Sequence, residues 1–423
     1  MKRTFALRGN ICYSKNSDHI ECMEDGWIIC EQGISQGVFK QLPDKYKGIA
    51  VYEYHQHIIT PGLIDLHVHA PQYSFRGLNM DQELLDWLNT NTFPEEAKYI
   101  DLEYARAAYK LFVHDLACGA TTRAAVFATL HVEATELLMD LLEESGIRAL
   151  VGKVNMDRNS PMDLCEVSGA QSETDTRRWL DRVCDKYKHV KPILTPRFIP
   201  SCTDELMERI SSIQKEHSLS IQSHLSENPG ETAWVRELCP DTDFYGEAYD
   251  KYHLFGGACP TIMAHCVYSS EREIALMKER GVFIAHCPQS NTNLSSGIAP
   301  VRTYLDNHMH IGLGSDVAGG FTTSIFRAMA DAIQVSKLRW RLSDDSLKSL
   351  TIDEAFYLGT KGGGAFFGEV GSFEKGFELD ALVLDDSSLP HPQELSVKQR
   401  LERLIYLSDD RHIVDKFVFG NKI

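Results

Sequence analysis

The sequence of 423 residues predicts an α/β fold: a (β/α)8 TIM barrel with a small β-sandwich domain formed by both termini. Three observations lead to this prediction. Short apolar runs alternate with helical patterns through the middle of the chain, as in parallel strands joined by helices. Strand-like runs occupy both ends of the chain. Candidate metal ligands follow several of the apolar runs, and barrels place their functional residues at the carboxyl ends of the strands.

The two ends of the chain are predicted to form the β domain together. Its N-terminal part covers residues 1–58, and its C-terminal part covers residues 372–423. Short runs in both parts have the aromatic and β-branched composition that is typical of strands. The expected strands span residues 4–13, 26–30, 380–384 and 416–422.

Residues 59–371 are predicted to form the barrel. About eight alternations between an apolar run and a helical pattern occur in this stretch, which is the number that a (β/α)8 barrel requires. The sequence contains no internal repeat and no low-complexity segment. The apolar runs lie at 63–66, 121–127, 149–154, 192–195, 219–223, 261–264, 282–285 and 310–313.

Two helical patterns have clear ends. One begins with Ser270 and Glu273 in the spacing of a capping box, and it ends at Gly281, which can adopt a left-handed conformation. The other covers residues 203–210, with Thr203 as its expected N-cap. These signals predict where helices begin and end between the strands.

Composition excludes several classes of protein. The net charge is −17 and the pI is about 5.4, so no basic surface for nucleic acid is expected. No apolar run approaches the ~20 residues that cross a bilayer, and the N-terminus lacks the apolar segment of a secretory signal. None of the 11 cysteines forms a C-x-x-C pair, which argues against disulfides and thiolate zinc sites. A cytoplasmic location without membrane partners is expected.

The most informative motif is a His-x-His pair. His67 and His69 follow an apolar run at residues 58–65. Residues i and i+2 of a strand point to the same side, so both imidazoles can bind one metal ion. The motif alone is weak evidence, because the chain has 17 histidines.

Three more candidate ligands end further apolar runs: His224, His265 and Asp316. Each one alone is best explained as a satisfied polar residue at a strand end. That explanation does not account for four segments that end in His, His, His and Asp, all of which are ligand types that suit zinc. The four segments together therefore favour a metal site.

These motifs resemble the amidohydrolase superfamily and, more closely, its guanine deaminases. The metal motifs are common to the superfamily, whereas the segments around Gln72 and Arg197 are more specific. The resemblance extends over most of the chain. It is carried by residues 61–75, 195–198, 223–228, 285–291, 312–320 and 407–411.

The resemblance implies one zinc ion per subunit, bound by His67, His69, His224 and Asp316. His265 is then expected to hydrogen-bond the metal-bound water rather than to bind the metal. Some members of the superfamily hold two metals with a modified lysine after the third strand. Lys153 has a similar place in this sequence, but the one-metal relatives make a structural role the expectation.

The implied reaction is the hydrolytic deamination of guanine to xanthine and ammonia, a step in purine catabolism. Metal-bound hydroxide would attack C2 of the base. Asp316 would take the proton from water, and His265 would assist. Glu227 lies three residues after His224, so we expect it to be the acid–base shuttle for ring nitrogen N3 and the leaving amine. A lone glutamate on a loop is otherwise most often a solvated carboxylate.

Substrate recognition requires donors for the acceptors of the base. The Arg197 fork matches the O6/N7 edge of guanine, and Gln72 could bind the N3/N9 side with both amide groups. Phe198 could stack on the ring. Trp87 is as consistent with a helix core as with the pocket. The expected contact set also includes the metal ligands and the shuttle: His69, His224, Glu227 and Asp316. Residues His286 and Asn291 are assigned supporting roles.

Three function classes remain open from the sequence: a zinc deaminase, another amidohydrolase such as a triazine or pyrimidine hydrolase, and a metal-free binding or scaffold protein. Gln72 with Arg197 and Phe198 favours the deaminase, and the complete ligand set argues against the scaffold. Differences from the family pattern at residues 199–200 and 339–341 leave a related aminated purine or a pterin as an alternative substrate. A homodimer is implied by the resemblance alone.

Overall fold

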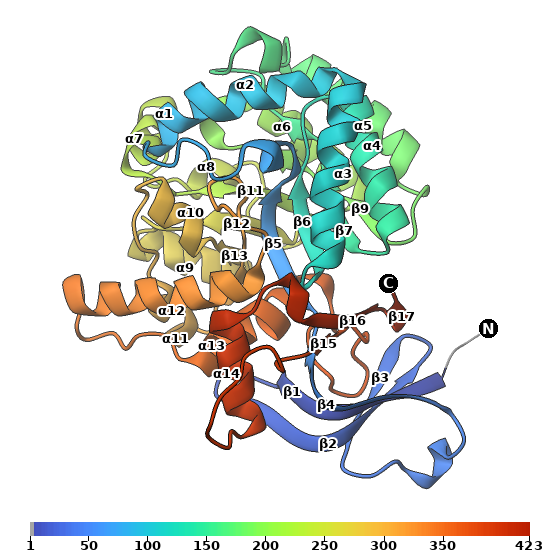
Figure 1. Cartoon of the computed structure of the whole chain (residues 1–423). Helices are drawn as coiled ribbons and strands as arrows, with labels where there is room; N and C mark the ends of the chain where they lie inside the picture. Colours follow the sequence, from blue (N-terminus) through green and yellow to red (C-terminus); the bar gives the residue numbers. More distant parts are fainter. Residues whose placement is uncertain (1–3) are drawn as a thin grey trace.

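The computed structural model describes residues 4–423, so the first three residues of the predicted 1–58 segment lie outside the described part. Figure 1 shows a strand–helix region with a further sheet below it, near which the C-terminus lies. Among the described residues, no helix is long and apolar enough to span a membrane.

Eight strands of the middle region form two parallel four-stranded sheets in chain order. The first sheet contains β5 (Leu63–His69), β6 (Thr121–Phe127), β7 (Arg148–Gly152) and β9 (Val190–Pro192). The second contains β11 (Ile221–Leu225), β12 (Thr261–His265), β13 (Phe283–His286) and β14 (His310–Leu313). Two short strands, β8 (Val154–Asn155) and β10 (Thr195–Pro196), pair with each other. This alternation confirms the predicted α/β class.

Helices connect the strands and cover their outer faces in Figure 1. A π-helical turn, Leu88–Thr92, joins the first helix of the chain to the second. The helices are α1 (Leu84–Trp87), α2 (Phe93–Glu96), α3 (Leu102–Cys118), α4 (Val132–Ser145), α5 (Gly169–Val183), α6 (Asp204–His217), α7 (Pro229–Leu238), α8 (Glu247–Asp250), α9 (Glu271–Arg280), α10 (Pro288–Asn293), α11 (Val301–Asp306), α12 (Ile325–Leu342), α13 (Ile352–Tyr357) and α14 (Val397–Leu407).

The three helix ends predicted from capping signals are confirmed. Thr203 caps α6 by accepting a hydrogen bond from a backbone N–H, and Ser270 caps α9 in the same way. Gly281 ends α9 with a φ of +66°. One detail of the prediction is wrong: the Glu273 carboxylate does not complete a capping box. It instead accepts hydrogen bonds from the Ser226 hydroxyl and from a loop N–H, because a buried carboxylate is best satisfied by several donors.

Both ends of the chain contribute to one seven-stranded sheet, in the order β17-β16-β15-β4-β1-β2-β3. The predicted sandwich is therefore not shown, since strands from both termini share one hydrogen-bonded sheet. Alternation along a strand predicts a buried face but not what covers that face. The strands are β1 (Thr4–Ser14), β2 (Ile20–Glu31), β3 (Ile34–Phe39), β4 (Ala50–Pro61), β15 (Ala381–Leu384), β16 (Ile413–Val418) and β17 (Asn421–Lys422).

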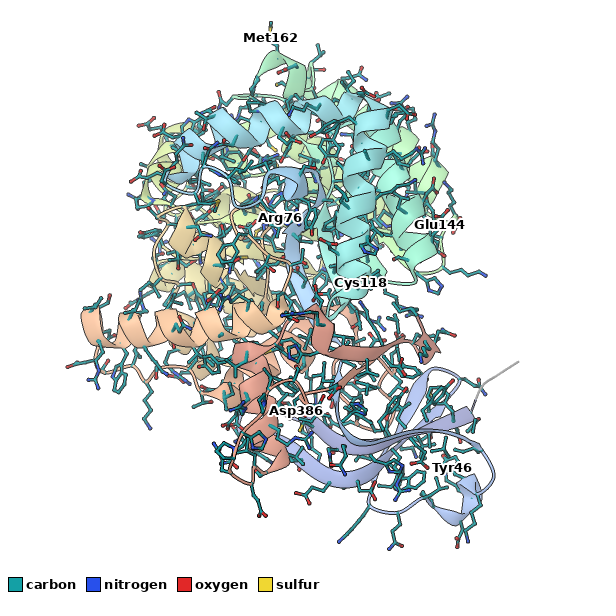
Figure 2. All side chains as sticks on the ribbon, viewed as in Figure 1. Tyr46, Arg76, Cys118, Glu144, Met162 and Asp386 are labelled. Carbon is teal, nitrogen blue, oxygen red and sulfur yellow. The ribbon has the colours of Figure 1, made fainter. Side chains whose placement is uncertain are left out.

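The terminal sheet joins the strand–helix region directly. Only Gly62 separates β4 from β5, and a side chain there would collide with Thr122 of the neighbouring strand. A buried ion-pair cluster reinforces this junction: Arg123 on β6 donates to Asp380 and to Glu378. Figure 2 shows side chains throughout both regions, with Tyr46 beside the terminal sheet and Met162 at the far end of the molecule.

Candidate active site

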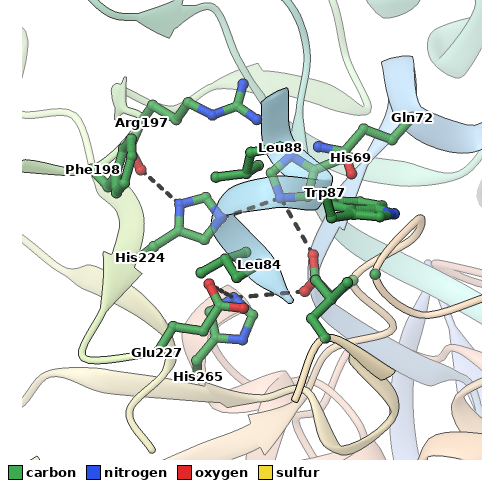
Figure 3. A pocket seen from close by; sticks show the side chains of 13 residues that line it. His69, Gln72, Leu84, Trp87, Leu88, Arg197, Phe198, His224, Glu227 and His265 are labelled. Carbon is green, nitrogen blue, oxygen red and sulfur yellow. Dashed lines mark hydrogen bonds and ion pairs between the residues drawn. The ribbon is translucent and has the colours of Figure 1, made fainter. Parts of the chain in front are cut away.

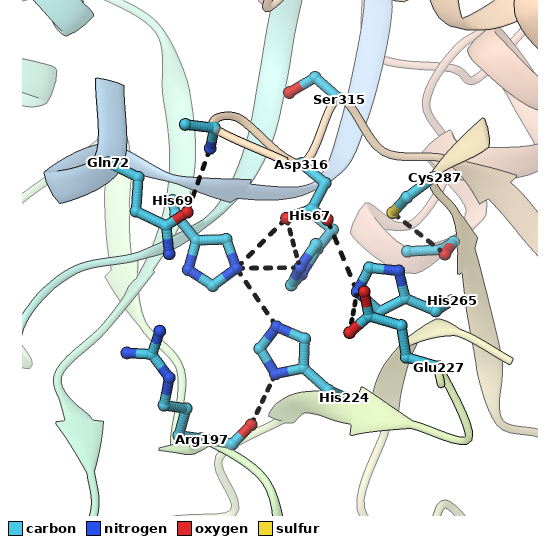
Figure 4. Close-up of polar contacts among 12 residues, drawn as sticks. His67, His69, Gln72, Arg197, His224, Glu227, His265, Cys287, Ser315 and Asp316 are labelled. Carbon is cyan, nitrogen blue, oxygen red and sulfur yellow. Dashed lines mark hydrogen bonds and ion pairs between the residues drawn. The ribbon is translucent and has the colours of Figure 1, made fainter. Parts of the chain in front are cut away.

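The predicted metal ligands meet at the carboxyl ends of the strands (Figure 4). His67 and His69 point to the same side of β5, and their Nε2 atoms are 3.1 Å apart. His224 at the end of β11 lies 3.2 Å from His69, measured between the Nε2 atoms. Asp316 follows β14, with its Oδ1 atom 3.2 Å from His67 Nε2 and 3.4 Å from His69 Nε2. All four side chains are buried.

This donor set fits a metal ion. Metal–nitrogen bonds of ~2.0–2.1 Å in tetrahedral geometry place neighbouring ligand atoms ~3.3 Å apart, which matches the spacings seen here. Burial lowers the pKa of His67, His69 and His224, although Asp316 opposes this effect. Their imidazoles are therefore neutral at pH 7, with lone pairs that can bind a cation. Such unpaired facing nitrogens are otherwise costly inside a protein.

Buried neighbours hold the ligands in place. The Nδ1–H of His224 donates to the backbone oxygen of Arg197 at 2.6 Å, which leaves Nε2 unprotonated on the metal side. Asp65 accepts hydrogen bonds from the His67 N–H and from both the N–H and the hydroxyl of Ser315. Asp65 therefore ties the strand that carries two ligands to the segment that carries Asp316.

His265 and Glu227 lie beside this group. The Nδ1–H of His265 donates to the Asn291 side-chain oxygen at 2.9 Å, so Nε2 faces the site. That Nε2 is 3.4 Å from Glu227 Oε2 and 3.6 Å from Asp316 Oδ2. His265 and Asp316 both have left-handed backbone, with φ of +73° and +46°. Non-glycine residues in this conformation are strained, and they cluster at functional sites.

The surroundings of Glu227 favour its protonated form. Burial and the charge of Asp316 raise the pKa of Glu227 well above its ordinary value, while a hydrogen bond from Ser296 opposes the rise. In contrast, Asp316 stays ionised: burial raises its pKa, but His67 and His265 hold it far below the usual range. Two neighbouring carboxyl groups with pKa values pushed apart form an acid and a base.

A pocket of about 430 Å³ opens onto this cluster (Figure 3). Trp87, which the sequence left undecided, lines this pocket together with Leu84 and Leu88. Residues 199–200 and 339–341, where the sequence differs from the family pattern, are not among its lining residues. The lining residues are His69, Gln72, Leu84, Trp87, Leu88, Arg197, Phe198, His224, Glu227, His265, Leu294, Asp316 and Gly319.

Gln72 and Arg197 form one wall of the pocket, and both donate hydrogen bonds to the Glu96 carboxylate. The Arg197 guanidinium donates to both Glu96 oxygens, at 2.5 and 3.1 Å, and the Gln72 amide nitrogen donates to Glu96 Oε1 at 2.9 Å. The Gln72 oxygen accepts the Ala318 N–H at 3.1 Å. Each end of the Gln72 amide thus has one partner already, and the expectation that Gln72 offers both amide groups to a ligand stays a prediction.

The remaining predicted residues take different places. Phe198 lies in the pocket wall, with its ring 6.5 Å from that of His224. Lys153 is buried away from the pocket lining, and its ammonium pairs with Glu166 at 2.5 Å, as a structural role requires. His286 is buried, and neither of its ring nitrogens has a hydrogen-bond partner among the described residues. Burial and His265 lower the pKa of His286 to about 3.

Sequence reasoning missed Glu96, Asp65 and Glu231. Glu231 accepts the Glu227 N–H at 2.9 Å, and burial with the charge of Glu227 raises its pKa to about 7. Asp65 carried a usable signal, because an acidic residue inside an apolar run is costly unless it is paired. Glu96 carried none, since it follows Glu95 in a polar stretch that is typical of an exposed helix start.

Comparisons with known proteins agree with this geometry. The model of the amidohydrolase family matches residues 58–423. Guanine deaminases from Rattus norvegicus and Dictyostelium discoideum are 39% and 40% identical, over 87% and 86% of this chain and 83% and 82% of their own. A guanine deaminase from C. acetobutylicum, crystallised with guanine in its active site, superposes with a TM-score of 0.97 at 48% identity, covering 100% of both chains. The chain therefore belongs to the amidohydrolase family of hydrolytic enzymes and, within it, to the guanine deaminases.

Proposed function

We propose that this protein is a zinc-dependent aminohydrolase that converts guanine to xanthine and ammonia. The observation that carries the proposal is the junction of two groups in one pocket: a buried ligand set and a wall of hydrogen-bond donors around Arg197. The relative from C. acetobutylicum binds guanine in its active site, which supports the same substrate for this chain.

His67, His69, His224 and Asp316 would hold the metal, one ion per subunit. Three neutral imidazoles and one carboxylate suit zinc, which prefers nitrogen ligands in four-coordinate sites. When bound there, zinc supplies Lewis-acid chemistry, which makes a water-derived nucleophile available at neutral pH.

Proton transfer is assigned to the carboxyl groups of this chain. The raised pKa of Glu227 favours its protonated form, so it can donate a proton to N3 of the ring. Addition at C2 interrupts the conjugation of the ring and makes N3 basic, so the donor is needed at that point. Asp316 remains ionised and can accept the proton that water releases. His265 lies between the two carboxyl groups and can stabilise either charge.

The base would be oriented by donors at one end and by rings on its faces. Arg197 would donate to O6 and N7, and Gln72 would add one N–H. Phe198 and Trp87 provide aromatic surface in the same pocket. This orientation directs C2 and its amine toward the metal ligands and Glu227.

The proposal includes the architecture that positions these groups. The two parallel sheets would close into one (β/α)8 barrel over residues 59–371. Backbone hydrogen bonds support closure at both seams: Gln222 N–H donates to the Leu194 oxygen, and Asp316 N–H donates to the His67 oxygen. The β domain of residues 1–58 and 372–423, the homodimer and the cytoplasmic location stay predictions.

The test is a spectrophotometric assay of the zinc-loaded protein that follows loss of guanine and release of ammonia. Adenine, cytosine and 8-oxoguanine serve as parallel substrates. We expect turnover of guanine and not of adenine or cytosine. Activity on another base with none on guanine would keep the metal site and overturn the substrate, and inactivity on every base with zinc bound would overturn the aminohydrolase.

A further inference from the structure

Glu96 is a buried acidic residue that contributes to the pocket wall without lining the pocket. It ends α2, and its carboxylate receives three hydrogen bonds, two from Arg197 and one from Gln72. Phe93, one turn earlier on the same helix, lies against the Arg197 guanidinium, with 5.3 Å from its central carbon to the ring centroid. The helix thus contacts the Arg197 guanidinium twice: Phe93 lies over its flat face, and Glu96 binds the N–H groups at its edge.

Charge is the first consequence of this arrangement. Arg197 is 3% exposed and Glu96 is 1% exposed. A buried guanidinium without a counter-charge is strongly unfavourable, whereas a paired one is tolerated. Glu96 therefore allows the pocket to present a charged hydrogen-bond donor while the wall as a whole stays neutral, as an uncharged ligand requires.

Hydrogen-bond direction is the second consequence. Glu96 binds one hydrogen on each terminal nitrogen of Arg197, and a guanidinium has five N–H groups. Glu96 also fixes the Gln72 amide, because only the NH2 end can face a carboxylate. The Gln72 oxygen is turned to the Ala318 N–H, so the groups of Arg197 and Gln72 that remain for a ligand are mainly N–H donors.

We propose that Glu96 is a positioning residue that makes this wall rich in N–H donors, so that the site selects a ring carbonyl over an exocyclic amine at the C6 position. This inference rests on the proposed function. A purine that carries oxygen at C6 offers acceptors to the wall, whereas an amine there would place donors against donors. An unmatched pair of buried donors is costly, which gives hydrogen-bonded sites their high selectivity.

The substrate pair that isolates this selection is guanine and 2,6-diaminopurine. Both carry the reacting amine at C2, and they differ at C6, where the second has an amine in place of the carbonyl oxygen. Hydrolysis would release ammonia from C2 in both. The two bases also differ at N1, which carries hydrogen only in guanine, so the change in the ratio of their kcat/KM values between wild type and variant measures the wall. Hypoxanthine, which has the carbonyl but no C2 amine, measures binding without turnover.

The experiment compares wild type with Glu96→Gln, each loaded with zinc. The glutamine has the same shape, but its NH2 end would face an Arg197 N–H in either orientation, and in one of the two it would also face the Gln72 NH2. Arg197 must therefore turn away from it. We expect KM for guanine and Kd for hypoxanthine to rise about 10- to 100-fold, with kcat much less affected. The preference for guanine over 2,6-diaminopurine should fall about 10-fold or more. Glu96→Asp keeps the carboxylate and should restore part of the preference.

Glu95→Gln is the matched control, because its carboxylate binds Lys98 and Tyr104 instead of the pocket wall. It should retain wild-type kinetics. Adding Glu96→Gln to Arg197→Met should lower kcat/KM much less than Glu96→Gln does in wild type, since Glu96 acts mainly through the arginine and only in part through Gln72.

The possible failures are distinguishable. If wild type neither deaminates guanine nor binds hypoxanthine, the proposed function fails and this inference fails with it. If wild type does both and Glu96→Gln has the same substrate preference, the proposed function stands and the positioning role is overturned. If Glu96→Gln does not fold, the same comparison between Glu96→Asp and wild type decides, because the shorter carboxylate cannot reach both partners.

Discussion

The molecule contains two buried arginine–carboxylate clusters at opposite ends of its parallel strands. At the carboxyl ends, Arg197 stacks on Phe93 and pairs with Glu96. At the amino ends, Arg123 pairs with Asp380 and Glu378. In that second cluster Arg148 shares Glu378 and stacks on Phe419, 4.0 Å from its ring centroid. The same residue types thus recur in two places with different surroundings.

The difference lies in what faces each arginine. Arg123 donates to two carboxylates that lie just before β15 of the terminal sheet, and Asp380 also accepts the N–H of Phe419, just after β16. The cluster therefore joins β6 to the terminal sheet. Arg197 has one carboxylate behind it and the pocket in front. A cluster enclosed between two parts of the fold fixes them together, whereas a cluster that faces a pocket can bind a ligand. The predictions below follow from this contrast.

The largest effect is expected for the acid–base group of the pocket. Glu227→Gln keeps the shape of the side chain but cannot donate a carboxyl proton. We expect kcat for guanine to fall about 10²- to 10⁴-fold, the range for general acid–base groups. Zinc content should stay at one ion per chain, because Glu227 is outside the ligand set. Near-normal kcat in the metal-loaded variant would remove Glu227 from the reaction.

The next effect concerns the Arg123 cluster. Arg123→Met leaves the Asp380 carboxylate buried without its counter-charge, while Glu378 keeps Arg148, so the free energy of unfolding should fall by about 3–5 kcal/mol. Guanine kinetics at a temperature where the variant is folded should match wild type. Chemical denaturation and steady-state kinetics measure both quantities. A normal stability, or a selective loss of guanine binding, would contradict the structural role of this cluster.

The same substitution in the pocket should act on the substrate. Arg197→Met removes a charged donor from the wall, and kcat/KM for guanine should fall about 10- to 100-fold, mainly through KM. Glu96 loses its partner as well, so kinetics are compared at a temperature where both proteins are folded. Unchanged KM would show that another residue binds the carbonyl edge of the base.

The smallest effect is a pH dependence of stability. Burial and His265 hold the pKa of His286 to about 3, below its ordinary value of 6.5. Between these two values the unfolded chain takes up a proton that the folded chain excludes, so stability falls as the pH falls from about 6.5 toward 3. His286→Gln should make this decline shallower, because unfolding of the variant takes up one proton fewer. Denaturation curves at pH 7.5, 6 and 5 test this, and parallel declines in both proteins would contradict it.

Much of the strand–helix region could be predicted, because its signals are local. The position of His67 and His69 on one side of β5 follows from the period of a strand, and Ser270 and Gly281 set the ends of α9. The terminal sheet was harder to predict. Its strands come from both ends of the chain, and local alternation does not determine whether they form one sheet or two.

The site residues that belong to a local sequence motif could be predicted. The residues that hold them in place from distant parts of the sequence could not. His224, Asp316 and Arg197 each follow an apolar run. Glu96 contacts Arg197 across 101 positions in the chain, through a helix that follows a π-helical turn. Its neighbour Glu95 has the same chemistry but binds other partners, so only the fold determines which glutamate supports the wall.

The central claim is that the protein hydrolyses guanine at C2, and labelled water tests it most directly. Zinc-loaded protein is incubated with guanine in H₂¹⁸O, and the purine product is analysed by mass spectrometry together with the ammonia released. The account predicts xanthine with one ¹⁸O atom at C2, the original oxygen at C6, and one ammonia for each xanthine. Unchanged guanine, or a product without the label at C2, would contradict it.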